Sequence, residues 1–130
     1  MANPNLINVS SITGNTTYYT PSVNTAVVLL ANAASSGVVN IINNVVAANV
    51  TASTTNATVS IYTNGAVSQG SAPSGGTAYP IVYQLSVPAN SSVVVSDKST
   101  AFYLQEGTSI SVTSGTANAV TYTTSYEAIS

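Results

Sequence analysis

The sequence predicts an all-β protein, an antiparallel β-sandwich or jelly-roll-like fold built as a single domain over residues 1–130. Apolar and polar residues alternate along much of the chain, turn residues recur at strand-sized intervals, and charged pairs spaced for a helix are absent. The length of 130 residues suits one domain, and a hydrophobic content of 45% is sufficient for one core.

Alternation is clearest in residues 81–87, where the odd positions are large and apolar, so we expect a strand that points Tyr83 into the core. Residues 57–62, 109–113 and 120–123 repeat the pattern and predict further strands, with Tyr122 also in the core. Each of these strands should have one dry face and one wet face, as in antiparallel sheets covered on one side.

Denser apolar runs occupy residues 27–30, 38–42 and 45–50. They are rich in β-branched residues and short, which favours central strands that are covered on both faces. The Ala and Leu spacing in residues 26–34 also permits one short helix, an alternative that the poor helix formers around it weaken.

Turn signals separate these runs, at residues 13–15, 35–37, 64–65, 88–90, 106–107 and 114–116. The Gly, Ser and Pro residues of Gln69–Thr77 predict an exposed loop between strands that end near Tyr62 and begin near Tyr79. After Pro88 the pattern predicts four strands, arranged as a meander or as part of a jelly roll. Residues 1–15 are expected to form an extended N-terminal arm or an edge strand, and residues 1–5 lack the features of a secretory signal.

The composition leaves few side chains that could catalyse a reaction or bind a metal. Only 3% of residues are charged, and the chain contains no His, Cys, Trp or Arg. Enzymes draw acids, bases, nucleophiles and metal ligands mainly from those residue types, so we expect no enzyme, no cofactor and no metal site. Lys98 is the only cation, which argues against a nucleic-acid partner. The most apolar stretch is about half the length that crosses a bilayer, so we expect no membrane partner.

Two catalytic arrangements can still be imagined around the few charges. Asp97 and Glu106 flank one predicted strand and could act as a carboxylate pair, although the length of that strand should hold them far apart. Ser96 and Ser99 flank Lys98 and could form a Ser–Lys pair, but a nucleophile of that kind needs a buried lysine and an oxyanion hole. Solvated turn residues are the favoured interpretation in both cases.

The aromatic residues are biased toward tyrosine, with eight Tyr and one Phe. A tyrosine ring buries a large apolar area while its hydroxyl tolerates water, which suits both protein interfaces and sheet rims. The candidate partner-binding residues are Tyr18, Tyr19, Tyr62, Tyr79, Tyr103 and Tyr126.

A surface made of Ser, Thr and Asn lacks the charge repulsion that keeps most proteins apart. Neutral groups also enter an interface without the desolvation cost of ions. We therefore expect a subunit whose sides are covered by copies of itself or by a larger scaffold.

Short segments along nearly the whole chain share their order and spacing with a known family. They are Met1–Asn5, Asn8–Val9, Ile12–Gly14, Ser86–Ala89, Val93–Val95, Asp97–Thr100, Tyr103–Gly107, Ser109–Ile110 and Ser125–Ser130. Together they resemble the small β-rich virion proteins of tailed phages that infect marine bacteria and cyanobacteria. One departure is the strand after the Ser-Ser-Gly turn, where that family carries basic residues and this chain has Val38, Val39 and Asn40.

The resemblance implies a capsid decoration or cement protein that binds between capsid subunits as a homotrimer and stabilises the shell. Its partners would be itself and the major capsid protein or another virion protein. It implies a place in the virion, at the capsid surface, after assembly in the host cytoplasm, and it brings no catalytic residue.

Other roles stay open. A neck, tail or fibre component fits the same resemblance, and an adhesive or carbohydrate-binding module could use the exposed tyrosines with the Gln69–Thr77 loop. A filament or tube subunit fits the neutral surface equally well.

Overall fold

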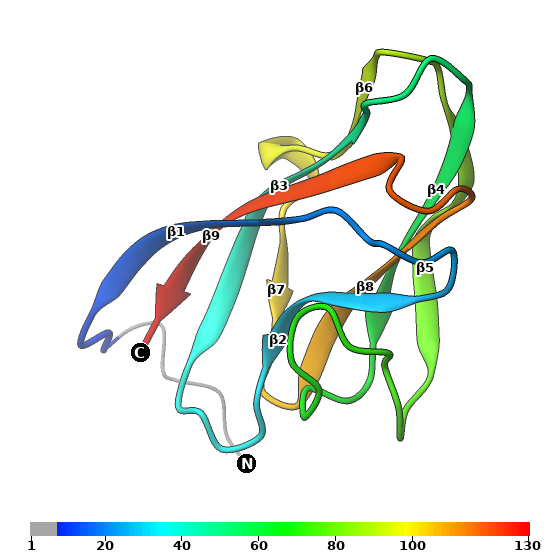
Figure 1. The fold of residues 1–130 in the computed structure, drawn as a ribbon. Helices are drawn as coiled ribbons and strands as arrows, with labels where there is room; N and C mark the ends of the chain where they lie inside the picture. Colours follow the sequence, from blue (N-terminus) through cyan, green and yellow to red (C-terminus); the bar gives the residue numbers. More distant parts are fainter. Residues whose placement is uncertain (1–7) are drawn as a thin grey trace.

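A computed structural model describes residues 8–130 and shows two antiparallel sheets packed face to face (Figure 1). Sheet A contains β1 (Ile12–Tyr19), β9 (Val120–Ile129), β3 (Val39–Asn49), β6 (Ser92–Ser96) and β7 (Phe102–Leu104). Sheet B contains β2 (Val27–Asn32), β8 (Thr108–Ser114), β4 (Thr55–Tyr62) and β5 (Ala78–Val87). The predicted β-sandwich is confirmed.

The strand pairing is that of a jelly roll. The first strand pairs with the last (β1 with β9), the second with the next to last (β2 with β8), and β4 pairs with β5. β6 and β7 both pair with β3 and act as one interrupted strand. The chain after Pro88 is thus part of a jelly roll rather than a meander, because β8 leaves the sheet of its neighbours β7 and β9.

The core lies between the two sheets and is built from the inward side chains of both. Its buried hydrophobic members include Leu29, Ile42, Val45, Val59, Val87, Leu104, Ile110, Val112, Val120 and Tyr122. β-Branched residues dominate this list, as expected for side chains that pack on a pleated surface. Tyr122 is fully buried, which confirms its predicted place in the core.

Two expectations for the dense apolar runs need correction. The runs at residues 38–42 and 45–50 are not separate strands, since they join in β3, and a register shift between Ile42 and Asn44 absorbs the polar pair between them. The run at residues 27–30 is a strand and not a helix, but β2 lies at the edge of sheet B instead of in its centre. Its outer side is covered by a loop, which explains why its sequence resembles that of a central strand.

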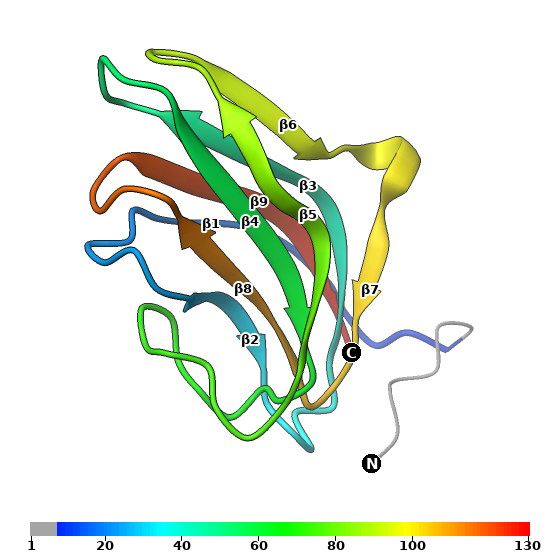
Figure 2. The same ribbon diagram turned by 90° about the vertical axis from the view of Figure 1, so that its right-hand side faces the viewer.

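That covering loop is the predicted Gln69–Thr77 segment, which lies between β4 and β5 as expected and passes over sheet B near β2 (Figure 2). The Gly70 N–H donates to Val28 O, and the Val28 N–H donates to Ser71 O, both at 2.9 Å. The loop is exposed over most of its residues, yet its backbone is fixed to the edge of β2.

The prediction that Tyr83 belongs to the core is wrong, because its side chain is 71% exposed. β5 pairs with β4 through two register shifts, and Gln84 has a positive φ of 50°. This bulge reverses the alternation, so Val82 packs toward the core while Tyr83 points outward.

The two ends of the described chain meet beside sheet A. The Ser11 and Ser130 backbones exchange two hydrogen bonds of 3.0 Å, which extend the β1–β9 pairing by one residue pair. Residues 12–19 form an edge strand, one of the two forms expected for residues 1–15. The expectations for residues 1–7, including the absence of a secretory signal, lie outside the described residues. Within residues 8–130, no helix has the length and apolar character needed to span a membrane.

Candidate functional site: the outer face of sheet A

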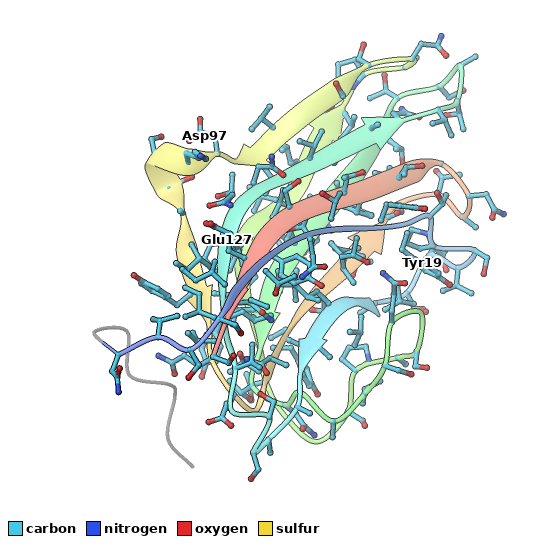
Figure 3. The ribbon with its side chains drawn as sticks, turned by 90° about the vertical axis from the view of Figure 1, so that its left-hand side faces the viewer. Tyr19, Asp97 and Glu127 are labelled. Carbon is cyan, nitrogen blue, oxygen red and sulfur yellow. The ribbon has the colours of Figure 1, made fainter. Side chains whose placement is uncertain are left out.

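The outer face of sheet A is the side of β1, β9, β3, β6 and β7 that points away from the core, seen in Figure 3. One row of directly opposed residues crosses it from Tyr18 through Thr123 and Val46 to Val94. A second row runs from Gly14 through Glu127 and Ile41 to Tyr103. Because opposed residues in a sheet share a face, the side chains of each row lie side by side.

Large apolar side chains stand exposed at both margins of this face. Tyr18 and Ile12 on β1 are 69% and 60% exposed, while Val94 on β6 and Tyr103 on β7 are 60% and 53% exposed. The residues between them on β9 and β3 are mostly half-buried. The face therefore carries exposed apolar side chains at both margins, while its centre combines the polar residues Thr123 and Glu127 of β9 with Val46 and Ile41 of β3.

Two pairs of hydroxyl groups on this face hydrogen-bond to each other. Thr16 Oγ1 lies 3.1 Å from Ser125 Oγ, and Thr20 Oγ1 lies 2.7 Å from Thr121 Oγ1, so hydroxyl pairs link β1 to β9. Groups that already hydrogen-bond within the face lose little when water is removed from it. This arrangement lowers the cost of covering the face with another protein.

Glu127 is the single charged residue on the two rows. Its Oε2 accepts a 3.3 Å hydrogen bond from Asn43 Nδ2 at the β3 bulge. Its place near the middle of the face is labelled in Figure 3. A partner that covers the face must leave this carboxylate solvated or supply it with a donor, since burying an unpaired charge is costly.

Asp97 and Lys98 lie at the corner between β6 and β7, where Lys98–Thr100 form a 3-10 turn (Figure 3). Asp97 Oδ1 accepts from the Ser99 N–H at 2.9 Å and from the Ser99 hydroxyl, and these bonds hold the pKa of its carboxyl below the ordinary value. Asp97 thus caps the turn, the structural role expected of an exposed turn carboxylate.

The residues of the two imagined catalytic arrangements form hydrogen bonds that stabilise local turns. Glu106 Oε2 accepts a 2.9 Å hydrogen bond from the Gly37 N–H, so this carboxylate joins the β2–β3 turn to the turn before β8. Ser96 Oγ lies 2.9 Å from Thr100 Oγ1, while the Ser99 hydroxyl bonds Asp97. In the described part of the chain, no group of three or more His, Cys, Asp or Glu residues could hold a metal ion.

The six candidate tyrosines fall into three groups. Tyr18, Tyr79 and Tyr103 are exposed, but Tyr79 lies on β5 of the other sheet. Tyr19 and Tyr126 are half-buried and pack against the core. Tyr62 is only 8% exposed, and its hydroxyl accepts a 3.0 Å hydrogen bond from the Gly76 N–H, so the expectation that it reaches the rim is wrong.

Sequence reasoning missed Ile12 and Val94 as surface candidates. Ile12 is followed by the polar run Thr13–Thr17, and Val94 stands within three consecutive valines, so neither is singled out by alternation. Their common face exists only once β9 and β3 have brought β1 and β6 into one sheet.

Comparisons with protein-family models, curated proteins and solved structures found no match for this chain. Jelly rolls occur in viral capsid proteins, lectins and cupins alike, so the fold alone defines no function. The surface just described is the feature from which a function can be argued.

Proposed function

We propose that this chain is a non-enzymatic structural subunit of a virus particle, a capsid decoration protein that binds between shell subunits as a homo-oligomer. The supporting features are the jelly-roll topology, a surface with almost no charge, and the resemblance of the sequence to small phage virion proteins. The observation that carries the proposal is the outer face of sheet A, with its paired hydroxyl groups and the exposed apolar side chains at its margins.

This face suits a cementing role because it can contact a neighbouring surface at two separated points. Tyr18 and Ile12 lie along one margin, and Val94 and Tyr103 along the opposite one. Each aromatic anchor contributes roughly 1–2 kcal/mol to binding when it enters a pocket. Several copies presented together in a homo-oligomer multiply such modest contacts through their effective concentration. The bound subunits then act as additional cross-links in the shell.

A binding assay tests the proposal directly. Purified protein is mixed with empty mature shells of tailed phages that infect marine bacteria, the shells are sedimented, and bound protein is quantified. The expected result is saturation at a fixed ratio to the major capsid protein. Absence of binding to every shell tested would contradict the proposal.

Matched variants identify the face that binds. Tyr18→Ser and Tyr103→Ser should each weaken shell binding by about five- to thirtyfold. Tyr83→Ser is the control, since Tyr83 is as exposed as Tyr18 but lies on β5 of the other sheet. An equal loss with Tyr83→Ser would show that the outer face of sheet A is not the binding surface.

An adhesive or carbohydrate-binding function is the second candidate, favoured by Tyr79 and Tyr83, which are 61% and 71% exposed on β5. Aromatic rings stack on sugar rings, and lectins also use jelly rolls. A glycan array separates the two functions, because selective sugar binding that Tyr79→Ser and Tyr83→Ser abolish would favour this candidate.

Electron micrographs of the particle would distinguish a capsid position from a neck, tail or fibre position, and micrographs of concentrated protein would reveal filaments or tubes.

A further inference from the structure

Three of the four sheet edges are closed to further strand pairing. β2 is occupied by the loop residues Gly70 and Ser71, which bond to Val28. β5 contains Pro80, and its pairing with β4 is shifted twice. The edge formed by β6 and β7 is broken by the Lys98–Thr100 turn and its charges. Prolines, bulges, charges and covering loops are the devices by which proteins protect sheet edges.

β1 has no proline, bulge or charge, and the covering loop reaches its free edge only at Tyr18. Its eight residues pair with β9 in one continuous register, and the strand contains no proline and no charged residue. Ser11 and Ser130 exchange two backbone hydrogen bonds. This identifies which residue pairs of β1 and β9 are hydrogen-bonded and which are not. Since bonded and non-bonded pairs alternate, the N–H and C=O groups of Ile12, Gly14, Thr16 and Tyr18 point away from β9.

We propose that two copies of this chain pair through β1, antiparallel and related by a two-fold axis that passes next to Asn15. Ile12 of one copy then lies opposite Tyr18 of the second, and Gly14 lies opposite Thr16. The two copies of sheet A become one continuous sheet with a single outer face. This inference does not depend on the proposed virion function.

The register follows from two independent requirements. Opposed residues must share a face and must both direct their backbone groups toward the new partner, and only the even-numbered residues of β1 do so. Among the registers that pair even-numbered residues, the one centred on Asn15 pairs all four of these residues in each copy. It also places Ile12, which is 60% exposed, against Tyr18, which is 69% exposed, at both ends of the contact.

The distribution of charge around β1 is compatible with pairing to a second copy of the chain. Around a two-fold axis each group near the centre meets its own copy, so a charged strand would repel itself. β1 carries no charge, and the neighbouring Glu127 would lie three strand spacings and two residues along the strand from its counterpart, a distance of at least about 14 Å. That distance exceeds the screening length in physiological salt, about 8 Å.

One existing contact lies at the end of this edge. Gln69 Nε2 is 3.5 Å from Tyr18 O, a long hydrogen bond, and the same amide holds Leu29 O at 2.9 Å and Thr17 Oγ1 at 2.8 Å. Pairing therefore requires loss of only the weakest of the three Gln69 contacts.

Cysteine cross-linking tests the geometry, because the chain contains no cysteine of its own. In the proposed dimer the two copies of residue 15 form a non-bonded pair with Cα atoms about 4.5 Å apart, within the range of a disulfide. Asn15→Cys should form a disulfide-linked dimer under mild oxidation. Thr13→Cys is the matched control, since its two copies would be separated by four residues, about 13 Å along the strands. Equal cross-linking of both variants, or none with Asn15→Cys, would overturn the proposal.

Charge substitution tests the register without relying on a disulfide. Light scattering of the unmodified chain should show a dimer, and Ile12→Lys should raise its dissociation constant at least tenfold, because lysine on an edge opposes pairing. Adding Tyr18→Glu should restore the dimer by placing opposite charges across the contact. Val94→Lys is the control, being equally exposed on the same face but remote from β1. A monomer at all concentrations, or a dimer that Ile12→Lys leaves unchanged, would refute the pairing.

Discussion

The hydroxyl group of Tyr122 on β9 donates a 2.8 Å hydrogen bond to the backbone carbonyl of Thr113 on β8. The two residues belong to opposite sheets, so the bond spans the sandwich from sheet A to sheet B. Ser114 Oγ also lies 3.3 Å from the Tyr122 hydroxyl. A fully buried tyrosine thus keeps its one polar group bonded, which a core residue of this type requires.

Replacing Tyr122 with Phe should destabilise the protein by about 1–2 kcal/mol, because the Thr113 carbonyl loses its buried donor while the ring is retained. Urea unfolding followed by circular dichroism measures the change. Tyr18→Phe removes a hydroxyl from an exposed ring and should alter stability by less than about 0.5 kcal/mol. Equal effects of the two variants would show that the bond between the sheets contributes nothing.

Stability should fall at alkaline pH for the same structural reason. Burial raises the pKa of Tyr122 from 10.0 to about 12, so the unfolded chain loses this proton first. The contribution of Tyr122 to the free energy of unfolding is complete below pH 10, declines above it and is lost by about pH 12, a total of roughly 2–3 kcal/mol. Urea unfolding at a series of pH values should show this decline in the unmodified chain and a shallower one in Tyr122→Phe. Parallel pH profiles would contradict the assignment.

Asn49 should be one of the most sensitive polar positions. Its amide donates to Ser53 O at 2.8 Å and to Val87 O at 3.1 Å, while its Oδ1 accepts from the Thr51 N–H and hydroxyl. Asn49→Ala removes the donor of the buried Val87 carbonyl and the acceptor of the Thr51 N–H, and should cost about 2–3 kcal/mol in chemical unfolding. Asn24→Ala, at an exposed loop position, should change stability by less than about 0.5 kcal/mol.

Gly65 is required by close backbone packing. A Cβ atom at this position would overlap the Asn32 backbone and lie 2.8 Å from Thr108 O, and neither backbone group can move as a side chain would. Gly65→Ala should therefore lower the free energy of unfolding by about 3 kcal/mol. A Cβ at Gly14 meets nothing within 4 Å, so Gly14→Ala should be neutral or stabilising by about 0.5 kcal/mol. Similar thermal midpoints for the two variants would contradict this account.

The sequence predicted the fold class because alternation and turn residues are local signals. Tyr122 and Tyr83 show where that information ends, since both lie in alternating runs, yet only Tyr122 is buried. β9 lies inside sheet A between β1 and β3, whereas β5 is an edge strand whose bulges reverse the alternation. The choice between those outcomes depends on pairing partners far away in the chain.

The candidate surface was predicted less well than the fold. Tyrosine bias identified Tyr18 and Tyr103, but it also selected Tyr62, whose ring lies beneath the loop before β5. Ile12 and Val94 have no distinguishing local pattern and become neighbours of the tyrosines only through the order of strands in sheet A. A surface of this kind is a property of topology, which one sequence specifies only through its long-range contacts.

The two hydrogen bonds between Ser11 and Ser130 make the described chain nearly circular. A short Gly/Ser linker from Ser130 to Ser10 would close it, and the exposed Ala72–Pro73 peptide offers a place to open it again. A circular permutant made in this way should keep every strand pair while its new termini emerge from the loop that covers the edge of β2. Foreign peptides could then be displayed from this loop while the original ends of the described chain stay joined beside sheet A.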